Sequence, residues 1–313
     1  MKIAGLFFTL LTTLCTMRHT NASLNDGVYA ASLTPLNADL SCNYEELFSH
    51  CLDLIQRGCS GIVLGGTTGE GPSFSTHERI EMLEKIIQAG IPPQHILLAN
   101  GASNISETVE LCQAALKWDL PALLICPPSF YKNVSHEAVI AYYREIIQKV
   151  ADSRLRVLLY HIPQFSGVPI TLPIIQALTA EFPEIVIGIK ESEGNFELTK
   201  DILKGFPGFK VFVGHEKQIL EAVHLGGSGS ICGIANLYPE LIVSLYEMGK
   251  QEIRPENPQE LNVFFEAMKG LPFISAFKAV MENRKGDIWH RLRPPLMPLT
   301  EEQRASFIAT LEE

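Results

Sequence analysis

The sequence predicts an α/β protein, a (β/α)8 TIM barrel with a C-terminal helical extension. Eight short apolar runs alternate with amphipathic stretches between residues 28 and 233, at the spacing of roughly 25 to 35 residues that is typical of βαβ units. The runs are almost continuously apolar, which favours parallel strands covered on their outer face over strands with one face in water. A doubly wound sheet rarely needs eight units, and no Gly-x-Gly-x-x-Gly motif follows the first run.

The individual elements follow from these runs and from local end signals. Gly58 follows the last turn of the first helix. Ser75, three residues before Glu78, is an N-cap signal for the second helix, and Gly90 follows its last turn; Ser106 marks the start of the third helix. The expected strands span residues 28–33, 61–64, 95–99, 122–126, 156–160, 185–189, 210–213 and 229–233. The expected helices span residues 44–56, 76–88, 106–116, 136–150, 172–181, 196–203 and 218–225.

The chain divides into three segments. Residues 1–22 are similar to a secretory leader, because Lys2 precedes a short apolar stretch that small residues follow, although Met17 is an alternative start. Residues 23–238 are expected to form the barrel. Residues 239–313 are expected to form the last barrel helix and the helical extension, with breaks at residues 254–258 and 294–298, where prolines interrupt the helical pattern.

Composition excludes several classes of protein. Hydrophobic residues make up 46% of the chain and charged residues 19%, which excludes a disordered chain. No apolar run approaches the roughly 20 residues of a membrane-spanning helix, so no membrane partner is expected. The formal net charge of -10 repels phosphate backbones, so no nucleic-acid partner is expected either.

The cysteines and histidines bear on metal binding and location. Seven cysteines include no Cys-x-x-Cys pair, and the nine histidines show no ligand spacing, so no metal centre is predicted. Cysteines scattered through apolar runs are typical of core residues in a reducing compartment, which favours a cytoplasmic protein. A functional leader at residues 1–22 would instead direct the protein to the periplasm or outside the cell.

Polar side chains gather where the expected strands end, which is the active-site face of a TIM barrel. Lys190 follows an apolar run, so its stem is expected to enter the barrel mouth. Burial there disfavours the ammonium and favours the free amine, which can attack a carbonyl carbon and form a Schiff base. The alternative is a lysine that extends its charge to solvent at a strand end.

Hydroxyl groups are expected close to this amine. Tyr160 ends the neighbouring strand and could carry protons to and from a breaking bond, or simply pack as an aromatic side chain. Thr67, Thr68 and Gly69 lie in a glycine-rich turn that suits a carboxylate, unless the turn merely reverses the chain. Tyr131, on the loop after the fourth strand, could join the hydroxyl relay, and loop aromatics also pack at subunit contacts.

Three motifs in register resemble the signature of the dihydrodipicolinate synthase and N-acetylneuraminate lyase superfamily: Gly66-Thr67-Thr68-Gly69-Glu70, Tyr160-x-x-Pro163 with Ser166-Gly167, and Gly188-x-Lys190. The resemblance implies a barrel that assembles as a homotetramer or homodimer and binds pyruvate as an imine, with no other cofactor. It also implies a role for each matching residue. Lys190 would form the imine, Tyr160 would shuttle protons, and Thr67 would link to Tyr160. Thr68 would bind the pyruvate carboxylate, and Tyr131 would reach across the dimer interface.

The second substrate divides this superfamily. The synthases typically have an arginine five residues after the shuttle tyrosine, where this chain has Phe165, and an apolar ring cannot replace a guanidinium. Sialate lyases have an Asp-Glu pair after strand seven and a serine near strand eight, where this chain has Glu216-Lys217 and Gly233. The residues expected around the second substrate are Phe165, Gly214, Glu216 and Ile231.

The predicted function is a metal-independent lyase or aldolase that reversibly cleaves a 4-hydroxy-2-oxo acid into pyruvate and an aldehyde. A 2-keto-3-deoxy sugar acid or a hydroxy-oxoglutarate fits this description, and the apolar Phe165 and Ile234 would suit an aromatic aldehyde. Three alternatives stay open: 4-hydroxy-tetrahydrodipicolinate synthase, which joins pyruvate to aspartate semialdehyde, N-acetylneuraminate lyase, and a non-catalytic pyruvate-binding regulatory protein. The expected partners are therefore a small 2-oxo acid, an aldehyde and copies of the same chain.

Overall fold

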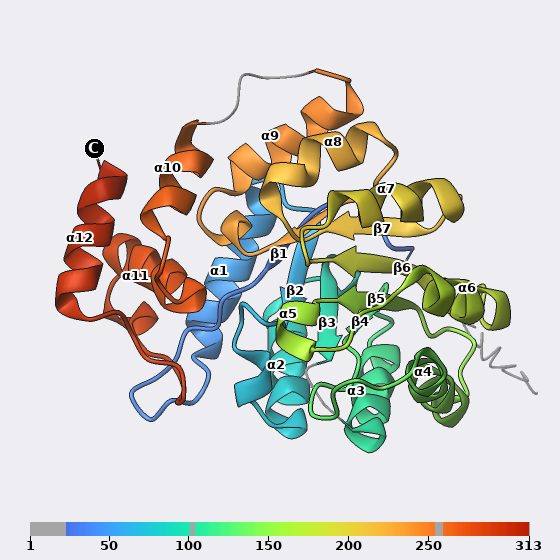
Figure 1. Ribbon diagram of the computed structural model, residues 1–313. Helices are drawn as coiled ribbons and strands as arrows, with labels where there is room; N and C mark the ends of the chain where they lie inside the picture. Colours follow the sequence, from blue (N-terminus) through green and yellow to red (C-terminus); the bar gives the residue numbers. More distant parts are fainter. Residues whose placement is uncertain (1–22, 101–103, 254–258, 313) are drawn as a thin grey trace, which may run out of the picture.

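The structure is a computed structural model that describes residues 23–100, 104–253 and 259–312. Eight parallel strands form a closed barrel in sequential order, with β1 paired to β8. This confirms the predicted fold class (Figure 1). The strands are β1 (Gly27–Ala31), β2 (Gly61–Leu64), β3 (Ile96–Asn100), β4 (Leu123–Ile125), β5 (Val157–His161), β6 (Val186–Glu191), β7 (Lys210–Val213) and β8 (Gly229–Cys232). The leader-like residues 1–22 and the expected break at 254–258 lie outside the described residues.

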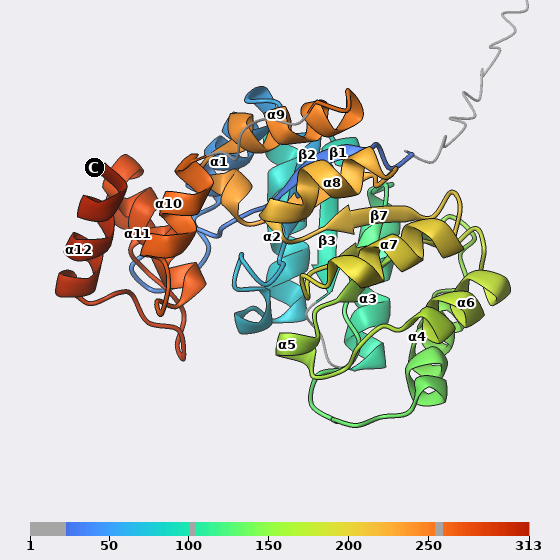
Figure 2. The same ribbon diagram turned by 45° about the horizontal axis from the view of Figure 1, so that its top comes forward.

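Helices surround the barrel and continue beyond it. The helices that follow the strands are α1 (Tyr44–Gln56), α2 (Thr76–Ala89), α3 (Ile105–Lys117), α4 (His136–Val150), α5 (Pro163–Ser166), α6 (Leu172–Glu181), α7 (Phe196–Gly205), α8 (Ile219–His224) and α9 (Pro239–Lys250). The C-terminal helices α10 (Gln259–Ala267), α11 (Phe273–Lys285) and α12 (Glu301–Glu312) group on one side of the barrel in both views (Figures 1 and 2). Short 3-10 turns are η1 (Gly71–Ser73), η2 (Pro93–His95), η3 (Glu216–Gln218), η4 (Ile234–Asn236) and η5 (Asp287–Trp289).

Strand alternation separates two hydrophobic cores. Along β1, Val28 and Ala30 belong to the core between strands and helices, whereas Tyr29 and Ala31 belong to the core inside the barrel. This two-residue period is the pleat of a strand. On β6 the outer core contains Ile189, so the neighbouring Lys190 projects inward.

Several boundaries differ from the expected ones. The strand β6 extends to Glu191, so Lys190 lies within the strand rather than after it. The third helix is capped by Asn104, whose side chain accepts the N–H of Glu107, and not by Ser106. The capping box at Ser75 forms as expected. Among the described helices, none is long and apolar enough to cross a membrane.

Candidate active site

A buried amine and a phenol meet at the carboxyl ends of β5 and β6. Tyr160 and Lys190 are direct partners in the strand register, which places both side chains at the same height on the inner face. The two residues are only 4% and 6% exposed. Lys190 Nζ donates to Tyr160 Oη at 3.1 Å and lies 4.4 Å from the centroid of the phenol ring. The side chain does not extend into solvent, which was the alternative for Lys190.

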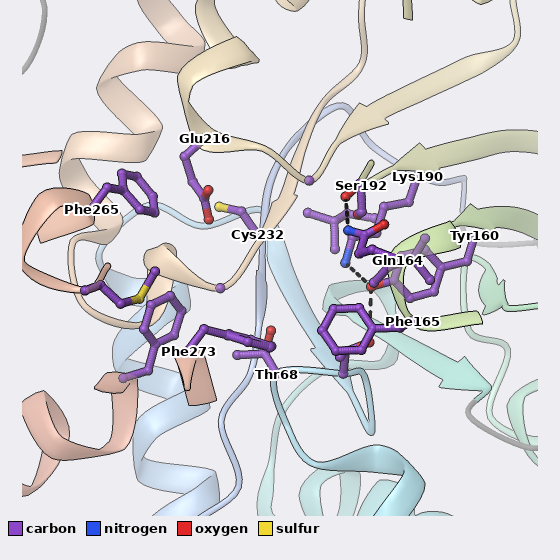
Figure 3. A pocket seen from close by; sticks show the side chains of 17 residues that line it. Thr68, Tyr160, Gln164, Phe165, Lys190, Ser192, Glu216, Cys232, Phe265 and Phe273 are labelled. Atoms are coloured by element: carbon purple, nitrogen blue, oxygen red, sulfur yellow. Dashed lines mark hydrogen bonds between the residues drawn. The ribbon is translucent and has the colours of Figure 1, made fainter. Parts of the chain in front are cut away.

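A threonine extends this pair into a chain of hydroxyl groups. Thr67 Oγ1 lies 3.3 Å from Tyr160 Oη, and either oxygen can donate. A proton on Tyr160 can therefore pass between the amine on one side and the threonine hydroxyl on the other. Figure 3 shows both contacts as dashed lines that converge on Tyr160.

The glycine-rich turn after β2 is held in a fixed shape. Glu70 adopts a left-handed conformation with φ of 58°. Gly69 packs so closely that a Cβ atom there would lie 2.5 Å from the carbonyl oxygen of Ser32. Thr34 Oγ1 donates to the Gly69 carbonyl oxygen at 2.8 Å. The turn therefore presents the hydroxyl groups of its threonines in one arrangement.

A buried ion pair joins this turn to the C-terminal extension. Glu70 and Lys278 are 1% exposed each, and Lys278 Nζ donates to a Glu70 carboxylate oxygen. The other Glu70 oxygen accepts the N–H of Arg293 at 2.9 Å, and Lys278 also donates to the carbonyl oxygen of Arg291 at 2.6 Å. Desolvation by burial lowers the pKa of Lys278, and the charge of Glu70 opposes that shift. Glu70 thus braces the turn through its bonds to the Lys278 side chain and the Arg293 backbone.

Lys190, Tyr160 and Thr67 line a cavity of about 190 Å³. Ligand pockets for drug-sized molecules are larger, roughly 300 to 1,000 Å³, so this volume suits a small metabolite. Of the residues that the sequence singled out, the ones that line the cavity are Lys190, Tyr160, Thr67, Thr68, Phe165, Gly214, Glu216 and Ile231. Gly69 does not line the cavity, and its close packing on Ser32 shapes the turn.

Two other residues that the sequence singled out, Tyr131 and Ile234, do not line the cavity. Tyr131 is 71% exposed beside Phe130 and does not reach the cavity of its own chain. Ile234 is fully buried in the core outside the barrel, so the expectation that it faces the substrate was wrong. Its backbone N–H instead contacts Glu216 Oε1 at 3.4 Å.

The wall that sequence reasoning missed comes from the C-terminal extension. Phe265 and Met268 lie on or next to α10, and Phe273 and Phe277 lie on α11. In Figure 3, Phe265 and Phe273 lie across the cavity from Lys190 and Tyr160. The signal in the sequence is the spacing of Phe273 and Phe277, since residues four apart share one face of a helix.

Two carboxyl groups near the site are buried. Burial raises the pKa of Glu216, which lines the cavity, and the positive charge of Lys190 partly opposes this shift. Burial also raises the pKa of Glu191, whose Oε1 accepts the N–H groups of Glu193 and Gly194. Glu191 therefore holds the loop after β6, while Glu216 places a carboxyl group inside the cavity.

His161, Glu191 and Glu193 form a group whose ligand atoms lie within 4.8 Å of one another. His161 Nδ1 accepts the N–H of Ile170 at 2.9 Å, which assigns the ring proton to Nε2. Nε2 lies 3.2 Å from the Glu193 carboxylate. Because both ring nitrogens are used in hydrogen bonds, His161 has no lone pair to offer a metal ion.

A second cavity of about 270 Å³ adjoins the first. The two cavities share Thr67, Tyr160, Ile162 and Phe165 as lining residues. Cys126 also lines the second cavity, and burial raises the pKa of its thiol to about 12. A thiol that stays protonated is a poor nucleophile.

A (β/α)8 barrel with buried lysine and tyrosine side chains at the carboxyl ends of adjacent strands has the layout of a barrel enzyme, because TIM-barrel enzymes carry their active sites at that face. The chain matches the Dihydrodipicolinate synthetase family over residues 24–313. It belongs to this family, and a protein named as a lyase is among the relatives that it matches.

Relatives cover nearly the whole chain. An uncharacterized DapA-like lyase of Chloroflexus aurantiacus is 32% identical over 289 residues, covering 91% of this chain and 96% of that protein. The 4-hydroxy-tetrahydrodipicolinate synthase 1 of Halalkalibacterium halodurans is 27% identical and covers 88% of this chain and 93% of its own. The structure of dihydrodipicolinate synthase from Agrobacterium tumefaciens matches with a TM-score of 0.86 and 28% identity, covering 92% and 99% of the two chains. A 2-keto-3-deoxygluconate aldolase of Sulfolobus solfataricus, at 21% identity and a TM-score of 0.80, covers 91% of this chain and 95% of its own and shares the fold.

Proposed function

We propose that this protein is a pyruvate-dependent Schiff-base lyase that reversibly cleaves a 4-hydroxy-2-oxo acid into pyruvate and an aldehyde. One observation carries the proposal: Lys190 Nζ lies 3.1 Å from Tyr160 Oη, and both side chains are buried. An amine beside a proton carrier is what imine formation needs, since carbinolamine formation and water loss both move protons.

The proposed reaction starts with attack of the Lys190 amine on the 2-oxo carbon. Loss of water from the carbinolamine gives an iminium ion. Tyr160 removes the proton of the 4-hydroxyl group, the bond between carbons 3 and 4 breaks, and its electron pair moves to the iminium nitrogen through an enamine. The aldehyde leaves, carbon 3 of the enamine takes a proton, and hydrolysis returns pyruvate and the free amine. The same steps in reverse join pyruvate to an aldehyde.

The neighbouring groups have supporting roles in this proposal. Thr68 binds the carboxylate of the 2-oxo acid, and Thr67 accepts or supplies the proton that Tyr160 carries. Tyr131 acts only when a second copy of the chain brings it to a neighbouring cavity, which is consistent with its 71% exposure here. A homodimer or homotetramer is therefore part of the proposal.

A 4-hydroxy-tetrahydrodipicolinate synthase is the second candidate, because several relatives carry that name. The synthase must bind the carboxylate of aspartate semialdehyde. Among the described arginines, none lines the cavity, and Phe165 does. A strain that lacks its own synthase and requires lysine would separate the two candidates: growth without lysine supports the synthase, and failure to grow supports the lyase.

Borohydride reduction in the presence of pyruvate tests the proposal. We expect a stable three-carbon adduct on Lys190, found by mass spectrometry of the digested protein. The Lys190→Ala variant should gain no adduct, and Lys200→Ala, a change at a half-exposed surface lysine, should be labelled like the parent protein. No adduct on the parent protein would end the proposal.

A further inference from the structure

The cavity has one polar wall and one apolar wall. The polar wall carries Lys190, Tyr160 and Thr68 from the barrel strands and turns. The apolar wall consists of Phe165, Phe265, Met268, Phe273 and Phe277, and we refer to these five residues as the aromatic wall. Phe165 lines the cavity and is 56% exposed, so part of its ring faces open space.

The rings of the aromatic wall are arranged edge to face. The centroids of Phe165 and Phe273 lie 6.0 Å apart at an interplanar angle of 70°, and those of Phe273 and Phe277 lie 6.0 Å apart at 87°. Aromatic pairs favour such edge-to-face contacts because the ring edge is positive and the ring face is negative. A further planar ring can extend this arrangement, whereas a chain of hydroxyl groups would lose its hydrogen bonds to water against it.

The charges around the cavity disfavour an anionic second substrate. No described arginine lines the cavity. Lys217 lies outside it, with Nζ 5.7 Å from the centroid of the Phe265 ring. Glu216 adds a carboxyl group to the lining. A second carboxylate or a phosphate would therefore meet an apolar surface and an acid, with Lys190 already committed to the imine.

The polar side chains beside the aromatic wall are few. Gln164 Nε2 donates to the Ser192 carbonyl oxygen at 2.6 Å, so its amide is partly occupied. Ser192 Oγ is buried and has no hydrogen-bond partner among the described residues. Ser192, Glu216 and Gln164 are the polar side chains near the aromatic wall, which is a small set for the several hydroxyl groups of a sugar.

We propose that the aldehyde partner is an uncharged aryl aldehyde, whose ring packs on the aromatic wall while its carbonyl group faces Lys190 and Tyr160. This inference rests on the proposed lyase function and narrows its substrate class. The reaction is then the cleavage of a 4-aryl-4-hydroxy-2-oxobutanoate. The bond between carbons 3 and 4 breaks, the 4-hydroxyl proton goes to Tyr160, and pyruvate and the aryl aldehyde are released without any oxidant or reductant.

Three aldehydes test the inference in the direction of carbon-carbon bond formation. Pyruvate is mixed with benzaldehyde, with D-glyceraldehyde or with glyoxylate, and the product is measured by liquid chromatography. We expect kcat/KM for benzaldehyde to exceed that for the other two by about tenfold or more, the discrimination that a few apolar contacts supply. Equal or higher values for D-glyceraldehyde or glyoxylate would overturn the inference.

Two variants of the aromatic wall sharpen the test. Phe273→Ala should lower kcat/KM for benzaldehyde about tenfold, and Phe165→Arg should shift the preference toward glyoxylate, because a guanidinium recognises a carboxylate. The control is Phe206→Ala, which removes a ring that packs on Phe209 outside the cavity. An aryl preference that survives both wall variants would also overturn the inference.

Borohydride trapping with pyruvate alone is run on every variant. Trapping does not involve the aldehyde, so it reports whether the variant is folded and forms the imine. Normal trapping without an aryl preference refutes the substrate class and leaves the lyase function standing. Absence of trapping in the parent protein refutes the lyase function itself.

Discussion

Replacement of Lys278 by methionine should destabilise the protein strongly. Lys278 and its partner Glu70 are each 1% exposed, and the substitution removes one charge while the other stays buried. Loss of one partner from a buried ion pair costs about 3 to 5 kcal/mol. Glu70 keeps its bond to the N–H of Arg293, so we expect the lower end, about 3 kcal/mol. Methionine fills a similar volume, which limits the additional cost of a cavity.

The measurement is urea unfolding followed by circular dichroism, with the free energy of unfolding extrapolated to zero denaturant. The double variant Glu70→Gln, Lys278→Met removes both charges and should recover most of the loss. The control is Lys117→Met, which breaks the exposed pair with Glu84 and should cost less than about 1 kcal/mol. A loss below about 1 kcal/mol for Lys278→Met, or a double variant as unstable as the sum of its single changes, would refute the reasoning.

Three further predictions concern the cavity. Tyr160→Phe should lower turnover by about 10² to 10⁴-fold, the usual contribution of a proton carrier, while isothermal titration still detects pyruvate binding; unchanged turnover would remove Tyr160 from the mechanism. The pKa of Glu216 is higher in the folded protein than in the unfolded chain. The free energy of unfolding therefore falls as the pH rises from the unfolded pKa to the folded pKa of this group. Glu216→Gln should therefore raise the melting temperature more at pH 8 than at pH 4, and an equal rise at both would contradict this. Gly214→Ala places a Cβ atom 2.1 Å from Ser192 Oγ and should cost about 1 to 3 kcal/mol in urea unfolding; Ser192→Gly in the same chain should restore much of it, and no rescue would show that the clash lies elsewhere.

The barrel and its polar wall could be predicted because short-range patterns determine them. Lys190 follows a run of apolar residues, and strand alternation fixes which face it takes. The threonine turn carries its glycines in the sequence, and steric contact explains them, as at Gly69. Tyr160 and Lys190 are partners in the register of β5 and β6. Each of them ends an apolar run in the sequence, so both were expected at the carboxyl ends of neighbouring parallel strands.

Phe165 of the aromatic wall was predicted from the sequence, but the side chains that the C-terminal extension adds to this wall could not be predicted in the same way. Phe265 and Phe273 lie on helices of the extension, and their apolar positions look like those of any helix that packs on a core. Which ring faces the cavity depends on how the extension docks, and contacts between residues far apart in sequence decide that. The position of Tyr131 relative to a cavity also cannot be obtained from one chain, because this side chain is exposed on the surface of the single chain.

The helix α11 contacts both the aromatic wall and the threonine turn. One of its faces carries Phe273 and Phe277, which line the cavity, and the adjacent Lys278 holds Glu70 of the threonine turn. A Cβ atom on Gly233 would lie 2.5 Å from the Phe277 ring, so the helix also presses against the end of β8. A small shift of α11 would therefore move two parts of the site. One is the threonine turn, which is proposed to bind the carboxylate of the 2-oxo acid, and the other is the aromatic wall, which is proposed to select the aldehyde. Because the interior is closely packed, substitutions at buried residues of α11 that do not line the cavity should alter the binding of both substrates together. Changes at Phe165, which lies on a different element, should alter the binding of the aldehyde alone.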